Sequence, residues 1–344
     1  MKKAIFLSLI FLFLSSSPAL AASNYFGDGS DGDVTISSNT SLTNAADGDY
    51  VVKEYNTLTI NSGITLTTQN RAKGLFIYVK GNAIINGTLS MTARGASANP
   101  VSAGVASTGL RLPMLKSGST NTLSAANFTG AGSAIISAVD NQPGISGDGK
   151  IYQIVRTGGL GPTGSTTGDG ASGGTTANGT GGGAAGGIRY PEGGRSGDGG
   201  DGTCFSGGSG GGGTDNTFHG GDASNTGGAG GNGAGSFGTG GVGNPSGTPG
   251  SVPSGTGGVI WLVVGGNLTI GGTGIIEAEG GDTTHSSASG GASGGGVIKI
   301  IYAGSLSNSG SISVDGGYSE NWYADGGQGG DGSYEIVQVL SGCP

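Results

Sequence analysis

Glycine occupies 82 of the 344 positions of this chain, where an average protein has about 7%. A glycine has no side chain to bury and loses more conformational entropy on folding than any other residue. The excess is greatest in residues 158–258, which hold 43 glycines in 101 residues. This stretch cannot form a conventional hydrophobic core, so any order in it has to come from the backbone.

The apolar residues lie on either side of this stretch, in segments that repeat one pattern. LFIYVKGNAIINGTLSMTARG begins at Leu75, VIWLVVGGNLTIGGTGIIEAEGG at Val259 and VIKIIYAGSLSNSGSISVDGG at Val297. Looser copies are YNTLTINSGITLTT from Tyr55 and DVTISSNTSLT from Asp33. Their β-branched residues and period-two alternation predict short strands separated by Gly, Asn or Ser turns.

Repeated strand pairs that cannot bury their apolar faces alone are typical of a stacked array. We therefore predict an all-β protein in which residues 22–95 and 259–344 form coils of a β-solenoid, or β-helix. A Ser/Ala/Thr-rich insertion at 96–157 and a glycine-rich excursion at 158–258 separate them. A β-sandwich has similar strand and turn spacing and is the alternative, but recurrence of one motif favours the solenoid.

The glycines cluster as GGxGG, as in GGAGGNG at 227–233 and GGQGGDG at 326–332. This spacing suits an extended helix of the polyproline type with three residues per turn, whose neighbours pair their backbone groups laterally. Collagen is excluded because glycine does not occur at every third position and there are only 10 prolines. The excursion is therefore either a bundle of polyglycine helices or a flexible linker.

The N-terminus predicts export. Two lysines precede an apolar run at 4–14, and Pro18 and an Ala-x-Ala site ending at Ala21 follow it. We expect a signal peptide at 1–21 rather than a retained anchor, because the apolar run is too short to span a bilayer. The mature chain is then secreted or at the cell surface and does not insert into the membrane, since no later stretch of the sequence approaches a transmembrane length. Losing two of the 14 basic residues leaves 12 against 22 acidic ones, a net charge of −10. This charge argues against nucleic acid and anionic membranes as partners. The partners we expect are surface glycans or further copies of the chain.

No motif predicts a cofactor, a metal or a catalytic residue. The best acidic cluster consists of Glu277, Glu279, Asp282 and His285. Polysaccharide lyases and hydrolases on solenoid folds need clustered carboxylates, and strand alternation places Glu277 and Glu279 on one face. Aligning the repeats, however, puts Arg94, Glu279 and Asp315 at one coil position, which indicates a charged ladder. We expect a non-enzyme; an extracellular carbohydrate-binding or polysaccharide-degrading β-helix protein is the alternative.

Two further groups of residues are candidates for binding. Asp28, Asp31 and Asp33 in GDGSDGD offer oxygen ligands for Ca²⁺, but their spacing fits neither an EF-hand nor the calcium-binding nonapeptide, so we expect an exposed acidic turn. The loop GYSENWYADGG places aromatic residues in a turn and is a possible ligand-contact loop. Its aromatic members are Tyr318, Trp322 and Tyr323. Trp261 lies in an apolar strand and is expected in the core.

The coils that precede the glycine-rich excursion (NTLTINSGITL…GLFIYVKGNAIINGT) and the coil that follows it (GGGVIKIIYAGSLSNSGSISVDGG) resemble a broad class of glycine-rich β-solenoid surface proteins and adhesins of bacteria. They are similar also to glycine-rich tips of phage tail fibres, which assemble in the cytoplasm and carry no signal peptide. The resemblance covers most of the mature chain. It implies a structural or adhesive role and transfers no catalytic residue.

Cys204 and Cys343 are the two cysteines of the chain, and in a secreted protein we predict that they form one disulfide. The bond would close a loop of about 140 residues, for which chain entropy gives somewhat under ~5 kcal/mol of stabilisation. Intact-mass measurement should find a monomer two protons lighter than its reduced form. Two free thiols, or a dimer that reductant dissolves, would show that the cysteines are unpaired or link separate chains.

Overall fold

The computed structural model describes a set of separate stretches of the chain. They are residues 26–45, 51–96, 124–125, 136–137, 160–166, 169–175, 180–189, 194–200, 202, 206–214, 218–220, 222–223, 255–284, 290–320 and 326–338. These stretches contain strands and extended segments and no α-helix. Accordingly, none of them holds a helix with the length and hydropathy to cross a membrane.

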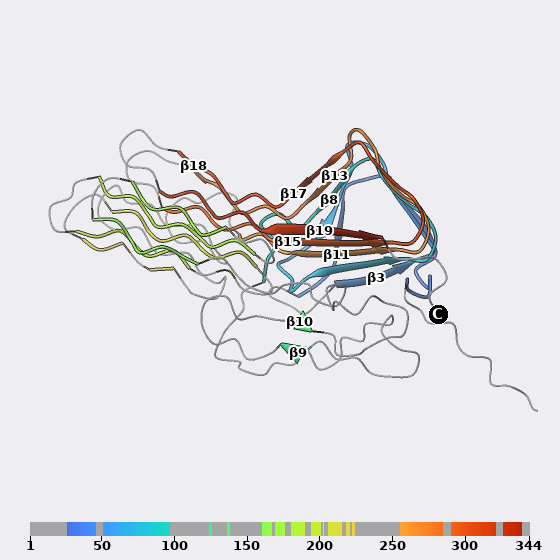
Figure 1. The fold of residues 1–344 in the computed structure, drawn as a ribbon, viewed down its shortest axis with the longest axis horizontal. Coiled ribbons are helices and arrows are strands. Elements are labelled where there is room, and N and C mark those ends of the chain that lie inside the picture. Colours follow the sequence, from blue (N-terminus) through green and yellow to red (C-terminus); the bar gives the residue numbers. More distant parts are fainter. Residues whose placement is uncertain are drawn as a thin grey trace, which may run out of the picture.

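Three parallel sheets of five strands each form the sides of a triangular solenoid (Figure 1). The first sheet contains β1 (Asp33–Ile36), β4 (Thr57–Ile60), β7 (Ala83–Ile85), β12 (Leu268–Ile270) and β16 (Leu306–Asn308). The second contains β2 (Thr40–Leu42), β5 (Thr65–Thr68), β8 (Thr88–Ser90), β13 (Ile275–Glu277) and β17 (Ser311–Ser313). The third contains β3 (Val51–Tyr55), β6 (Leu75–Val79), β11 (Val259–Val264), β15 (Val297–Tyr302) and β19 (Ser333–Gln338). The all-β prediction is confirmed, and the parallel stacking is that of a solenoid rather than an antiparallel sandwich.

Two pairs of short strands lie outside these sheets. β9 (Ser124–Ala125) and β10 (Ile136–Ser137) pair antiparallel. β14 (Thr283–Thr284) and β18 (Ser319–Glu320) pair in parallel and belong to excursions from the last coils.

The coils before and after the long insertion are direct neighbours. β11 pairs in parallel with β6, so that Ile260 lies opposite Leu75 and Val264 opposite Val79. β12 pairs with β7 and β13 with β8 in the same way. The chain therefore leaves the solenoid after one coil and resumes in the next, and the two halves of the sequence form one body.

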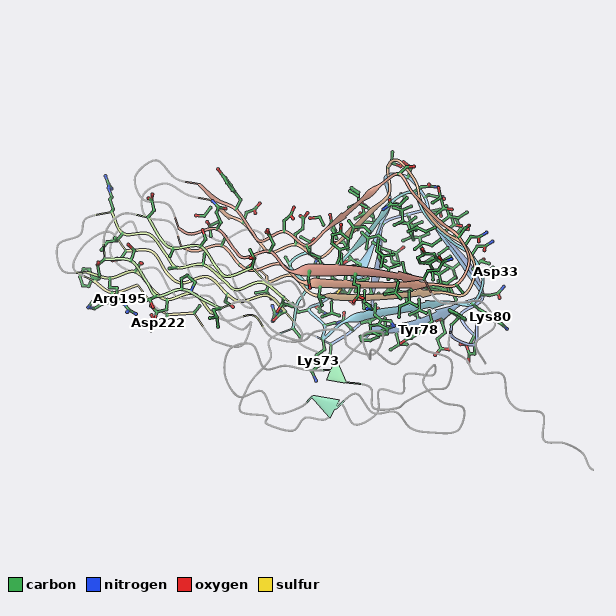
Figure 2. All side chains as sticks on the ribbon, in the orientation of Figure 1. Asp33, Lys73, Tyr78, Lys80, Arg195 and Asp222 are labelled. Atoms are coloured by element: carbon green, nitrogen blue, oxygen red, sulfur yellow. The ribbon has the colours of Figure 1, made fainter. Side chains whose placement is uncertain are left out.

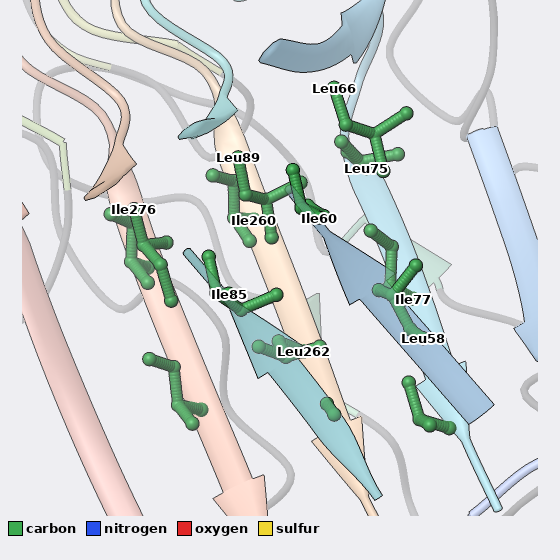
Figure 3. Packing of buried hydrophobic residues seen from close by; sticks show 14 of the residues in the cluster. Leu58, Ile60, Leu66, Leu75, Ile77, Ile85, Leu89, Ile260, Leu262 and Ile276 are labelled. Atoms are coloured by element: carbon green, nitrogen blue, oxygen red, sulfur yellow. The ribbon is translucent and has the colours of Figure 1, made fainter. Parts of the chain in front are cut away.

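The solenoid interior is filled by every second residue of each strand, because successive side chains point to opposite faces. Leu58, Ile77 and Leu262 are fully buried members of this core (Figure 3). Burial of each such side chain contributes about 1.5–3 kcal/mol, and the parallel register stacks equivalent residues in rows that run through the coils. This packing fixes the position of every coil.

The central strands of the third sheet are buried on their outer face as well. Trp261 is 3% exposed and is not part of the interior core. On the outer face of the sheet its ring stacks on that of Phe76, with the ring centroids 6.1 Å apart. Tyr78 and Lys299 are also buried, and Lys299 forms an ion pair with Glu335. The expected burial of Trp261 is confirmed, but in a second apolar layer, as unbroken apolar runs such as VIWLVV indicate.

The glycine-rich segments extend to one side of the solenoid and lie next to excursions of its last two coils, residues 278–296 and 314–332 (Figure 1). Backbone hydrogen bonds of 2.8 to 3.2 Å join them, and the donors of segment 180–189 change partner with a period of three residues. The amides of Gly181 and Ala184 donate to Gly295 and Ala292 of the excursion 278–296. The amides of Gly182 and Ala185 donate to Gly174 and Ala171 of segment 169–175. The amides of Gly183 and Gly186 donate to Gly200 and Gly197 of segment 194–200. Three neighbouring segments are therefore bonded to one central segment.

The close approach of these backbones excludes side chains at defined positions. A Cβ atom on Gly181 would lie 1.7 Å from the carbonyl oxygen of Gly330, whereas one on Gly272, in a solenoid turn, would meet nothing within 4 Å. A contact of 1.7 Å requires the two segments to separate.

We predict that Gly181→Ala destabilises the protein by about 1–3 kcal/mol, the typical cost of overpacking. Gly272→Ala, the matched control, should be neutral or slightly stabilising, because it only reduces the entropy of the unfolded chain. Urea unfolding of both variants measures the difference. Equal stability of the two would mean that the glycine segments are not packed as described.

Candidate functional site

The strongest contact candidate among the described residues is Tyr318, whose side chain is 55% exposed in the glycine-rich part of the molecule. Its amide donates to Oδ1 of Asp282 at 2.7 Å, and its carbonyl oxygen accepts from the amide of Thr283 at 2.8 Å. The phenol ring therefore projects from a backbone that is fixed on the side of β14.

The neighbouring residue is held from the other side. The amide of Ser319 donates to Oε1 of Gln328 at 3.1 Å, and Nε2 of Gln328 donates back to the Ser319 carbonyl at 2.9 Å. The backbone at Tyr318 thus has little conformational entropy left to lose on binding, which favours an aromatic contact residue there. The other two aromatic candidates, Trp322 and Tyr323, lie outside the described residues.

Two exposed apolar residues were missed by the sequence analysis. Phe218 is 57% and Leu160 is 60% exposed, and both lie in glycine-rich segments. The Thr214 hydroxyl donates to the Phe218 carbonyl at 2.8 Å, which fixes the backbone there. Each is a lone large apolar residue among glycines and polar residues, so its neighbours in sequence provide no core in which to bury it. This pattern could have been recognised in the sequence.

An ion-pair cluster ties two glycine-rich segments together at the end remote from Asp33 (Figure 2). Arg195 contacts Oδ1 of Asp198 at 2.6 Å and Oδ1 of Asp222 at 3.4 Å. All three side chains are about one-third exposed or more, and such pairs contribute about 0.2–1 kcal/mol each. The cluster joins backbone segments and leaves no unpaired cation for a ligand.

The acidic residues Glu277 and Glu279 face outward from the second sheet, as predicted, while Ile276 before them and Ala278 between them are buried. The proposed ladder is partly wrong. Asp315 does lie opposite Glu279, since Ser313 pairs with Glu277, but Ser90 also pairs with Glu277, so that Thr92 rather than Arg94 occupies the equivalent position.

Burial raises the pKa of Glu279 above its ordinary value. The Ser313 hydroxyl donates to its Oε1 and offsets part of this rise, while the negative charges of Glu277, Asp315 and Asp282 add to it. No basic side chain of the described residues is bonded to Glu277 or Glu279. His285, the fourth member of the cluster, lies outside the described residues.

The acidic turn at Asp28, Asp31 and Asp33 does not converge on one point. Asp31 accepts from the Glu54 amide at 2.8 Å and its own amide donates to the Glu54 carbonyl, so it closes the edge of β3. Oδ1 of Asp33 accepts from the side-chain Nδ2 of Asn56 and from the Thr57 hydroxyl, both at 2.7 Å. These two hydrogen bonds lower the pKa of Asp33, and the bond from Thr57 has the larger effect.

Within the described stretches no three His, Cys, Asp or Glu residues are grouped so that they could hold a metal ion. Asp28 accepts from the amide of Ser30, and each carboxylate of the turn thus has a structural partner. Cys204 and Cys343 lie outside the described residues, so their pairing stays a prediction.

No protein-family model, curated protein or solved structure matches this chain.

We predict that Glu279→Gln stabilises the protein at neutral pH. The pKa of Glu279 is raised in the folded state, so the folded state disfavours the ionised form, and the stability linked to the protonated form is lost as pH rises through the folded pKa. Glutamine retains an acceptor for the Ser313 hydroxyl and carries no charge. Thermal unfolding should show a higher Tm than wild type at pH 7 and little difference at about pH 4 and below. A lower Tm at pH 7 would mean that the carboxylate has a stabilising partner.

Proposed function

We propose that this is a secreted, non-catalytic structural or adhesive protein of a cell surface. In this account the solenoid is a rigid base, and the glycine-rich part carries the residues that contact a surface. The observation that supports it best is the distribution of exposed apolar side chains. Among the described residues, Leu160, Phe218 and Tyr318 lie in the glycine-rich part, against Ile84 and Tyr334 on the solenoid.

We further propose that the glycine-rich segments are polyglycine helices with three residues per turn. The donor period of three in segment 180–189 supports this, and segment 206–214 repeats it. There the amides of Gly208, Gly211 and Thr214 donate to the carbonyls of Gly181, Ala184 and Gly187. A flexible linker would not give regular partners on several neighbours.

The signal peptide predicted at 1–21 supports secretion, and the acidic charge of the mature chain supports a partner other than nucleic acid. Surface glycans are the partner class we favour, because an exposed tyrosine on a fixed backbone offers a flat apolar face with a polar tip. The alternative is a receptor-binding protein like those of phage tail fibres. It would use the same contact residues, but as part of a phage particle.

Tyr318→Ala should weaken binding to a surface glycan at least about fivefold, which corresponds to about 1 kcal/mol. The probe is an immobilised panel of lipopolysaccharides, peptidoglycan fragments and sialylated or fucosylated glycans, read with purified mature protein. Ile84→Ala, which removes an exposed apolar residue from a middle coil, is the control and should bind as wild type does.

Two results would contradict the proposal. If no glycan of the panel binds, or Tyr318→Ala and Ile84→Ala bind alike, the contact role of Tyr318 is wrong. Release of oligosaccharides from the panel, abolished in Glu277→Gln/Glu279→Gln, would instead favour the carbohydrate-degrading alternative.

A further inference from the structure

The two ends of the solenoid are built differently, although the chain makes a whole number of coils. Each sheet has five strands, and the last strands are β16, β17 and β19. We call these three strands the C-terminal end. β1, β2 and β3 form the opposite, N-terminal end.

The N-terminal end is closed along the third sheet. The amide of Glu54 donates to Oδ2 of Asp31, and the amide of Asn56 donates to the Gly32 carbonyl, each at 2.8 Å. Lys53 occupies the interior row of Ile77 but is turned to Asp31, with Nζ 3.5 Å from Oδ1. Bonded amides and an inward charge are devices that prevent strand addition at a sheet edge.

The C-terminal end has neither device among the described residues. Tyr334 continues the interior row of Ile298 and is 52% exposed, although the members of that row in the middle coils are fully buried. Leu306, Ile312 and Ile336 are only partly buried where they pack on the core. Their exposure means that the interior core is open at this end.

The backbone of the same strands is available for pairing. Ser311 and Ser333 donate to Gly274 and Gly296 of the preceding coil. Since donors alternate along a parallel strand, the amides of Ile312, Tyr334 and Ile336 point away from that coil. Among the strands that the structure describes, none follows β16, β17 or β19 in their sheets. An exposed edge with an apolar inner row is a template for another chain.

We propose that the C-terminal end binds the same end of a second copy of this chain across a two-fold axis. The rotation reverses strand direction, so β19 pairs antiparallel with β19 of the second copy, and β16 pairs with its β17. β16 and β17 both have three residues, so these edges match in length. The Ile336 residues of the two copies meet at the axis, and Tyr334 of each copy lies opposite Gln338 of the other copy.

The charges of this end fit a symmetric contact. The inner positions Tyr334, Ile336 and Gln338 are uncharged, and Glu335 on the outer face is already paired with Lys299 of its own copy. Stacking of the C-terminal end on the N-terminal end of a second copy would instead meet the closed edge at Glu54 and the inward Lys53. The contact is therefore isologous and stops at two copies. It does not depend on the proposed glycan binding.

Sedimentation velocity of the full mature chain, at about 1 to 100 µM in reductant, tests this proposal. Reductant excludes a disulfide through Cys343 as the link. Wild type should show a monomer–dimer equilibrium, and Tyr334→Asp should raise the dissociation constant at least about tenfold, because it places a carboxylate on the edge. Ile84→Asp, with the same charge change on a middle coil, should dimerise as wild type does.

Hydrogen exchange of β19 gives a second readout, since its outward amides should be protected more strongly in concentrated than in dilute protein. In dilute protein, where wild type is monomeric, an unchanged unfolding midpoint in Tyr334→Asp confirms that this variant is folded. The proposal is overturned by wild type that stays monomeric throughout the range, by an open series of larger species, or by equal weakening in both Asp variants.

Discussion

The whole structure depends on how a chain with few large side chains pairs its backbone amides and carbonyls. An unpaired buried peptide group costs about 1–3 kcal/mol, and glycine offers no side-chain burial to offset that cost. The solenoid satisfies its groups in parallel ladders above an apolar interior. The glycine-rich part satisfies them between segments that are distant in sequence, such as 180–189 with 290–296 and 206–214. Both parts therefore follow one rule, in which each segment has neighbours in fixed register.

The solenoid sets the positions from which the glycine-rich part is built. Residues 278–296 connect β13 to β15 and residues 314–332 connect β17 to β19, so the stacked coils hold both excursions side by side. Segment 180–189 then bonds to both, through Gly181 to Gly295 and from Gly327 to Ala185. Small side chains such as that of Ala184 are buried in this packing, and the Ser293 hydroxyl bonds within it by donating to the Gly255 carbonyl. The proposed contact residues are thereby carried on an ordered extension of the base.

Much of the solenoid could be predicted from the sequence, because period-two alternation and a recurring motif are local signals. The equivalence of Glu279 and Asp315 was predicted correctly, whereas Arg94 was misplaced. A turn at Met91–Arg94, with Ala93 at a left-handed φ of 54°, lengthens that corner of the coil. The repeats had been aligned on the glycine that follows each of the three charged residues, so the longer corner displaced Arg94 from the equivalent position. The partners of each glycine could not be predicted, since GGxGG motifs are alike and their pairing depends on the fold. The outer layer around Trp261 was missed for a related reason, because alternation alone does not show what lies against the second face of a sheet.

Hydrogen exchange of the backbone amides in segment 180–189 tests the central claim most directly. The account predicts that the amides of Gly181 to Gly186 are protected to a degree comparable with those of Leu75–Val79 in β6, because each has a carbonyl partner on a neighbouring segment. Protection should fall in Gly181→Ala, which forces the Gly330 backbone away. Exchange in 180–189 at the rate of an unstructured glycine linker, with β6 still protected, would contradict the account.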